Sequence, residues 1–212
     1  MPASADVLGD LTRIANDWRA LAAAWHVLLA ALLFGLVAGW RPSRWRAGLL
    51  LAVPLVSVSA LAWASGNPFN GAVFLALAIV FGGMALRLQP GTVRVSSPVR
   101  LAPGVLLTAC AWVYPHFLQA SSWTPYLHSS PLGLLPCPTL LAVLGVSLIV
   151  GHLDSRSWGM VLSAAAVTYG LIGTFRLGVA FDVTLLAGAA WAGLAAFIPH
   201  RAAATPRYHP SI

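Results

Sequence analysis

Three residues of this chain carry side chains suited to binding a soft metal ion. Cys137 is flanked by proline on both sides, and His116 and His128 lie upstream of it. A thiolate with two imidazoles would suit copper(I) or zinc. One hypothesis is therefore a metal site made of Cys137, His116 and His128, although the spacing of these residues matches no known metal motif.

The run Pro136-Cys137-Pro138 also has a structural interpretation. Proline is tolerated in the first turn of a helix, where the N–H groups have no partner inside the helix. The run would then start a helix that carries a small buried thiol. Alternatively, the two prolines remove backbone donors, and the carbonyl groups and the thiol face a cavity at a helix N-terminus, which favours a thiolate. The sequence leaves both interpretations open.

A second candidate is the pair Arg176 and Asp182, which flanks a turn between two apolar segments. Charged groups near a membrane are costly, so they usually pair or face water. The two residues are therefore an interfacial ion pair, or they line a vestibule in which Arg176 holds an anionic group and Asp182 holds a cation or a proton. The full set of candidate ligand or pathway residues is Asn67, Tyr114, His116, Cys137, Arg176 and Asp182.

Catalytic motifs are missing from the sequence. We find no Walker loop, no G-x-S-x-G elbow, no H-E-x-x-H and no dinucleotide fingerprint. The acidic residues are all aspartate. We therefore predict no catalytic residue and regard an enzyme as the less favoured class, with thiol chemistry at Cys137, His116 or Tyr114 as the form it would take.

The composition predicts a membrane protein. Of the 212 residues, 59% are hydrophobic and 8% are charged, whereas a soluble domain carries roughly 25% charged residues. The net charge of +7 comes from arginines that are scattered in short loops. That placement indicates contact with the headgroups of a lipid bilayer and argues against nucleic acid as a partner.

The apolar pattern predicts an all-α bundle of about seven transmembrane helices. Residues 1–19 read as a short amphipathic helix on the membrane surface, 20–198 as the transmembrane domain, and 199–212 as a flexible polar tail. Each apolar segment approaches the roughly 20 residues that a span needs. The segments are 20–40, 47–65, 71–88, 101–119, 135–151, 158–175 and 181–198.

The arginines predict how the bundle is oriented. In a seven-span arrangement, nine of the twelve lie on one side, and Arg13, Arg19 and Arg176 lie on the other. The positive-inside rule then puts the N-terminus outside and the C-terminus in the cytoplasm. The composition, rich in Ala, Arg, Gly and Pro, is typical of a GC-rich bacterial genome, so we expect a bacterial inner membrane.

Several further residues have packing interpretations. The motif Gly35-x-x-x-Gly39 is typical of close helix contact. Pro115 is expected to kink the segment 101–119. His26 is expected to be packed and hydrogen-bonded, and His152 is expected to lie in a solvated loop.

Several short elements together resemble an uncharacterised family of small bacterial membrane proteins, a domain of unknown function. They are Asn67-Pro68, Tyr114-Pro115, Pro136-Cys137-Pro138-Thr139, and Leu171-Ile172-Gly173 leading to Leu177-Gly178 and Asp182. Members carry a His-Tyr-Pro-like element ahead of the Pro-Cys-Pro, whereas this chain reads Tyr126-Leu127-His128-Ser129-Ser130-Pro131 there. The resemblance implies a helical membrane protein and no particular activity.

Three functions remain open at this stage. The first is transport or binding of a small solute or metal ion through a site on the extracytoplasmic side, which the polar residues near the outer helix ends favour. The second is a non-catalytic subunit or assembly factor with a partner in a membrane complex, or a homo-oligomer. The third is a thiol-dependent membrane enzyme.

Overall fold

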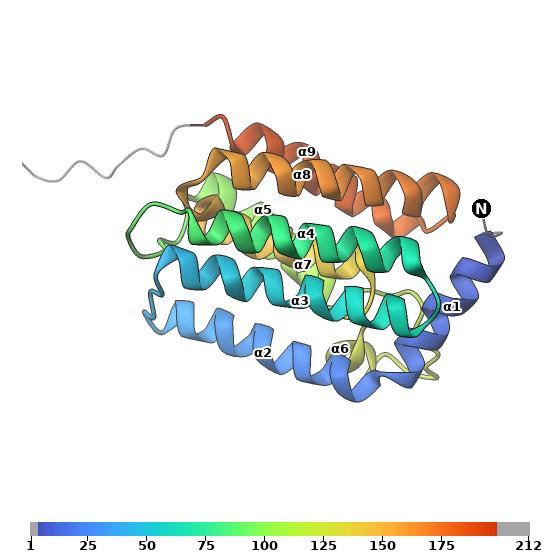
Figure 1. Ribbon diagram of the computed structural model, residues 1–212. Helices are drawn as coiled ribbons and strands as arrows, with labels where there is room; N and C mark the ends of the chain where they lie inside the picture. The colour runs from blue at the N-terminus through green and yellow to red at the C-terminus, as the bar shows by residue number, and fades with distance from the viewer. Residues whose placement is uncertain (1–3, 199–212) are drawn as a thin grey trace, which may run out of the picture.

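The computed structural model describes residues 4–198, and no strand occurs among them. The predicted all-α fold is confirmed (Figure 1). The helices are α1 (Ser4–Asp17), α2 (Arg19–Val37), α3 (Arg44–Ala64), α4 (Pro68–Leu86), α5 (Pro98–Trp112), α6 (Tyr126–Ser129), α7 (Pro136–Ile149), α8 (Arg156–Leu171) and α9 (Val183–Ala195). The predicted tail at 199–212 lies outside the described residues.

In the part of the chain that the structure describes, four helices are long and apolar enough to cross a membrane. They are α2, α3, α4, and α8 together with the π-helical turn that extends it to Arg176. The apolar helices α5, α7 and Ala180–Ala195 are shorter. Chain direction alternates from each of these seven helices to the next, and the connections alternate between the two ends of the bundle (Figure 1).

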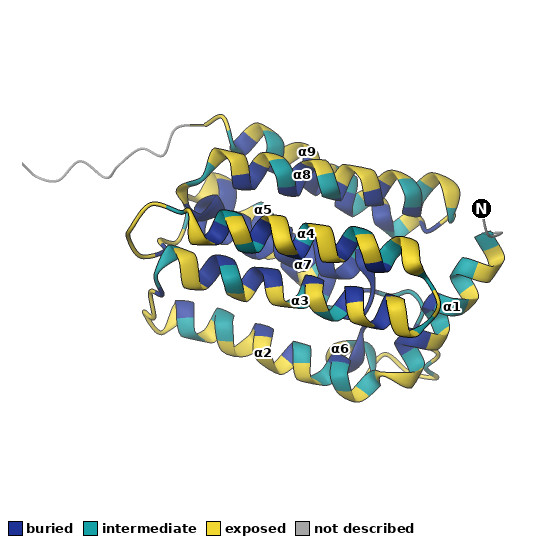
Figure 2. Ribbon diagram, viewed as in Figure 1, coloured by how far each residue is buried: buried dark blue, intermediate teal, exposed yellow. Residues whose placement is uncertain are grey.

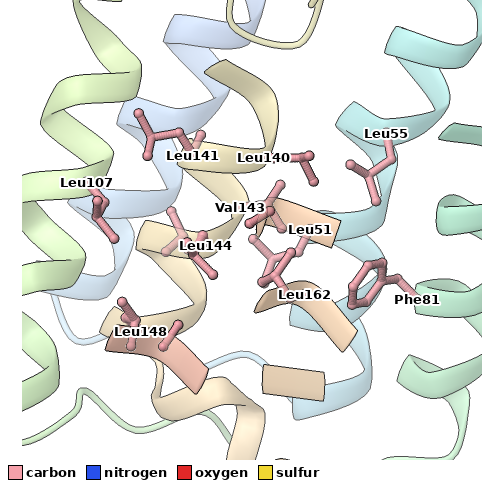
Figure 3. Close-up of a cluster of buried hydrophobic side chains, with 14 of the residues drawn as sticks. Leu51, Leu55, Phe81, Leu107, Leu140, Leu141, Val143, Leu144, Leu148 and Leu162 are labelled. Atoms are coloured by element: carbon pink, nitrogen blue, oxygen red, sulfur yellow. The ribbon is translucent and has the colours of Figure 1, made fainter. Parts of the chain in front are cut away.

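Helix α7 forms the centre of the bundle. All 14 of its residues are buried except Cys137, which is half-buried. A helix that touches protein on every side must be apolar all round, and α7 has this composition. Figure 2 shows the buried residues of α7 behind α3 and α4. Leucines of α7 pack against Leu51 and Leu55 of α3, Leu107 of α5 and Leu162 of α8 (Figure 3).

Helices α5 and α7 approach each other closely through two glycines. A Cβ atom added to Gly145 would lie 2.4 Å from Thr108 Oγ1 and 2.8 Å from the carbonyl oxygen of Gly104. The Thr108 hydroxyl is kept inside α5, because it donates to Gly104 O at 2.8 Å. The close contact depends on the absence of a side chain at Gly145.

The predicted role of Gly35-x-x-x-Gly39 in helix packing is wrong. Helix α2 ends at Val37, and Gly39 lies in the following turn with φ of +93°. Gly35 faces the ring of Trp40, which folds back on the end of its own helix. This motif therefore ends a helix, since glycine adopts positive φ at little cost.

The predicted segment 101–119 also ends earlier than expected. Helix α5 stops at Trp112, and Pro115 follows in non-helical chain. The ring of a proline disfavours helical geometry at the residue before it, here Tyr114. Pro115 therefore lies beyond the helix and does not kink it.

One end of the bundle, which we call the arginine end, holds the loops after α2, α4 and α7 and the end of α9. Backbone hydrogen bonds join the loops there, from Arg44 N to Gly91 O, from Val93 N to Pro42 O and from Ser96 N to Ile149 O. The side chain of Arg44 also forms an ion pair with Asp154. Arg100 is buried and donates to Ala195 O at 2.8 Å, so it caps α9.

The expectation that His152 is solvated is wrong. His152 is buried, and its ring lies 3.1 Å from the hydroxyl of Ser147. The same hydroxyl accepts from Trp158 Nε1 at 2.9 Å. His152, Leu153 and Asp154 all have positive φ, between 52° and 56°, and this turn brings the ring back against α7.

The opposite end, which we call the α1 end, is covered by α1. The buried residues of α1, Leu11, Ile14 and Ala15, pack with Ala22, Leu61, Leu134 and Leu135. Asn16 Nδ2 donates to Phe117 O at 2.9 Å, and Arg19 donates to Gln119 O at 2.7 Å. The apolar face of α1 therefore contacts protein, although the amphipathic pattern alone predicted contact with lipid.

Candidate functional site

A cavity of about 340 Å³ lies at the α1 end of the bundle. It is enclosed by α1, the start of α4, the start of α7, the end of α8 and the segment that precedes α9. The apolar part of its wall includes Val7, Leu11, Phe69, Phe117, Ile172 and Leu177. The polar part consists of Asn67, Asn70, Cys137, Tyr169, Arg176 and Asp182.

Four of the six candidate residues from the sequence therefore line one cavity, namely Asn67, Cys137, Arg176 and Asp182. A fifth, Tyr114, touches the cavity indirectly through Asp182. They come from parts of the chain that are more than a hundred residues apart. The bundle brings them together because every segment that carries one of them ends or begins at the α1 end.

Asp182 is the most buried charged group at this cavity, with 2% of its surface exposed. The hydroxyl of Tyr114, which is itself buried, donates to Asp182 Oδ1 at 2.5 Å. A hydrogen bond to a carboxylate is shorter and stronger than one between neutral groups. Tyr114 therefore holds the orientation of the carboxylate.

The second oxygen of Asp182 lies directly over Gly173. A Cβ atom added to Gly173 would be 1.8 Å from Asp182 Oδ2. No side chain larger than hydrogen leaves room for the carboxylate at this point. Gly173 therefore belongs to the site, although it contributes no functional group.

The position of Pro136-Cys137-Pro138 fits both interpretations, but the nearby Asp182 carboxylate does not favour the thiolate that the second interpretation expects. Pro136 is the first residue of α7, so the run starts a helix as the structural interpretation requires. Cys137 is also the one residue of α7 that is not fully buried, and it lines the cavity. Its sulfur lies 3.9 Å from Tyr169 O and close enough to Asp182 to interact with that carboxylate.

Asn67 and Asn70 fix the start of α4 beside the cavity. Asn67 Oδ1 caps the helix by accepting from Asn70 N at 3.1 Å. Asn70 Oδ1 accepts from the hydroxyl of Tyr169 at 3.1 Å, which links α4 to α8. In each side chain the carbonyl oxygen is used in these bonds, so the amide NH₂ group is the part left to serve a ligand.

Arg176 and Asp182 line the same cavity but form no ion pair with each other among the described residues. Arg176 is exposed, and its backbone carbonyl oxygen accepts from Ser4 Oγ of α1 at 3.1 Å. The interpretation as an interfacial ion pair is therefore wrong. The other interpretation, two opposite charges that line a vestibule, agrees with this geometry.

The predicted metal ligands do not come together. His116 is half-buried, with its ring edge-on to Tyr114 and within the electrostatic reach of Asp182. His128 is exposed on α6, which is tied to α5 by the bond from Trp112 Nε1 to Leu127 O. Within residues 4–198, no three His, Cys, Asp or Glu side chains are placed to hold a metal ion. The set Cys137, His116 and His128 is thus not assembled.

The sequence did not predict Asn70, Tyr169 or the α1 residues as part of the cavity lining, and Gly173 entered only within an element that carries the family resemblance. Asn70 follows Asn67 by one helical turn, so a helix start at Pro68 could have revealed it. Tyr169 is a polar residue in an apolar segment, which is a weaker signal. The role of Gly173 depends on a contact across nine residues of chain, and no local pattern predicts it.

No family model, no curated protein and no solved structure matches this chain.

Proposed function

We propose that the chain is a bacterial inner-membrane protein that binds and transports a small solute through the cavity at the α1 end. One observation carries the proposal, namely a cavity whose apolar wall contains a buried carboxylate, two amides and an arginine that forms no ion pair among residues 4–198. Ionisable groups inside membrane proteins are costly and mark substrate or ion pathways. Apolar walls with a few convergent polar groups are typical of small-molecule sites.

We further propose seven spans, made by α2 to α5 and α7 to α9. Helix α7 is about 21 Å long at 1.5 Å per residue, shorter than the roughly 30 Å hydrocarbon core. Its neighbours surround it, so its own length need not match the lipid. The arginine end then faces the cytoplasm by the positive-inside rule, and the cavity faces the extracytoplasmic side.

The resemblance to the uncharacterised bacterial membrane family is also a proposal, and the cavity supports it. Asn67, Cys137, Gly173 and Asp182 come from three of the elements that carry the resemblance, and all four line the cavity. The remaining element supplies Tyr114, which donates to Asp182. The family-like residues thus gather at one site.

Thermal unfolding of the purified protein in detergent tests the proposed function. The panel contains amino acids, amines, carboxylic acids, sugars, and copper and zinc salts, measured with the wild type, Asp182→Asn and Asp17→Asn. Asp17 is exposed at the end of α1, so its substitution is the matched control. A ligand at ~100 times its Kd stabilises a protein by about 2.7 kcal/mol, which corresponds to several degrees in a chain of this size.

We expect at least one compound to raise the melting temperature of the wild type and of Asp17→Asn, but not that of Asp182→Asn. The proposal fails if no compound in the panel stabilises the wild type. It also fails if Asp182→Asn responds to the same compound as strongly as the wild type does.

A further inference from the structure

We propose that the solute is a small zwitterion with an apolar body, of the amino-acid type, bound with its ammonium group at Asp182 and its carboxylate at Arg176. This inference rests on the proposed function and names its substrate class. It follows from two opposite charges that line one apolar cavity without pairing with each other.

The negative pole of the cavity is Asp182. The titratable groups around it are Tyr114 after α5, Cys137 on α7 and His116 in the loop that follows Tyr114. No arginine pairs with this carboxylate among residues 4–198. A primary ammonium group carries three donors and one positive charge, so it supplies the counter-charge that the protein does not.

The positive pole is Arg176. Its guanidinium makes no hydrogen bond or ion pair within the described part of the chain, and the side chain is exposed. The planar guanidinium matches a carboxylate with two parallel N–H···O bonds. At the exposed side of the cavity, Arg176 can contact an incoming carboxylate before the solute is fully enclosed.

The apolar wall between Asp182 and Arg176 favours a solute with an apolar body. Phe69 and Phe117 are aromatic, and Leu11 and Leu177 add aliphatic surface. A volume of about 340 Å³ lies near the lower end of the range for small-molecule sites. The amide groups of Asn67 and Asn70 remain as donors beside the polar end of such a solute.

The two charges together exclude simpler ligands. A cation without an anionic group would be attracted by Asp182 but repelled by Arg176 in the same cavity. An anion without a cationic group would be attracted by Arg176 but repelled by Asp182. Because Arg176 is exposed, water screens part of this repulsion, and the part that remains discriminates between ligands. A zwitterion is the class for which both charges are favourable.

Equilibrium binding of three compounds that share the branched alkyl chain of leucine tests this inference. Leucine carries both charges, 3-methylbutan-1-amine lacks the carboxylate, and 4-methylpentanoate lacks the ammonium group. Each is measured by isothermal titration with the detergent-purified wild type, Arg176→Gln and Asp182→Asn. The matched controls are Arg87→Gln and Asp17→Asn, both at exposed positions outside the cavity.

We expect leucine to bind the wild type at least tenfold more tightly than either analogue. Arg176→Gln should lower the affinity for leucine to about the affinity for the amine. It should not lower the affinity for the amine itself. Asp182→Asn should lower leucine affinity to about that of the carboxylate. Because Arg176 is exposed, its variant tests the inference even if Asp182→Asn does not fold.

Other outcomes separate this inference from the proposed function. Equal binding of amine and leucine, unchanged in Arg176→Gln, would overturn the zwitterion and leave a cation site. If none of the three binds but another compound of the panel stabilises the wild type and not Asp182→Asn, the inference fails and the proposed function stands. If no compound acts at all, both fail.

Discussion

Tyr114 and Asp182 form a hydrogen bond between two buried side chains, and the bond crosses from the end of α5 to the start of α9. Its contribution is larger than that of a surface pair, because a carboxylate left without its donor keeps its desolvation cost. The bond therefore affects both the stability of the fold and the orientation of the Asp182 carboxylate.

Replacing Tyr114 with Phe should destabilise the protein measurably. Loss of a hydrogen bond to a charged group costs ~1.5–3 kcal/mol, which corresponds to a drop of several degrees in melting temperature. Tyr126→Phe is the matched control, because Tyr126 donates to a backbone carbonyl in a partly buried loop and should cost less. Thermal unfolding in detergent measures both, and equal losses would contradict the larger role of Tyr114.

At this scale, part of the site could be predicted from the sequence. Asn67, Cys137, Arg176 and Asp182 were identified because polar residues at helix ends are unusual in such an apolar chain. The structure does not bring Cys137 together with His116 and His128. The types of these side chains predicted a metal site, but they do not show which loops lie next to each other in the fold. His128 is held on α6 by bonds that depend on packing of the loop after α5.

Among the elements, α5 and α7 approach each other closely, and their contact depends on two glycines. Gly145→Ala should push the helices apart, because the new methyl group would lie 2.4 Å from Thr108 Oγ1. Overpacking of this kind costs ~1–3 kcal/mol. The loss should appear as a lower melting temperature in detergent.

Gly83→Ala is the control for that prediction. Gly83 lies inside α4, and nothing is within 4 Å of an added Cβ atom. Alanine is favoured over glycine in a helix by roughly 0.5–1 kcal/mol, so this variant should be as stable as the wild type or slightly more so. A Gly145→Ala protein as stable as Gly83→Ala would show that the two helices can separate without cost.

Helix α1 acts as the cover of the cavity, through Val7 and Leu11. Leu11→Ala should loosen this cover, because a buried leucine that is truncated costs ~2–5 kcal/mol of packing. N-ethylmaleimide should then modify Cys137 several-fold faster in a Cys110→Ser background. Leu8→Ala, on the same helix but outside the cavity lining, is the control. Identical rates in both variants would mean that α1 does not limit access.

The helices themselves were largely predictable, and their ends were not. Hydropathy located every apolar segment, because burial and lipid both require apolar side chains. The predicted end of α5 lay too far along the chain, because the apolar run continues past Trp112. The helix stops at Trp112, since Pro115 disfavours helical geometry at Tyr114. The left-handed turn at His152 was unforeseeable, since three successive non-glycine residues rarely adopt positive φ.

The whole molecule has one end rich in arginine and one end with the cavity. Single cysteines at Gln89 and Ser122, introduced into a Cys110→Ser/Cys137→Ser background, test the proposed orientation. Both positions are exposed, and they lie in connections at opposite ends of the bundle. A membrane-impermeant maleimide should label Ser122→Cys in intact cells and Gln89→Cys only after permeabilisation. The opposite pattern would invert the topology and place the cavity in the cytoplasm.

The enclosure of α7 bears on how the protein is made. This helix packs against α3 and α5, which are synthesised before it, and against α8 and α9, which are synthesised after it. While the ribosome is still adding residues 156–195, one side of α7 has no native neighbour. Nascent chains that stop after Ile149 should therefore be recognised by membrane quality control and degraded. Chains that extend through Ala195 can enclose the helix and survive, so the native surroundings of α7 are completed only when α8 and α9 arrive.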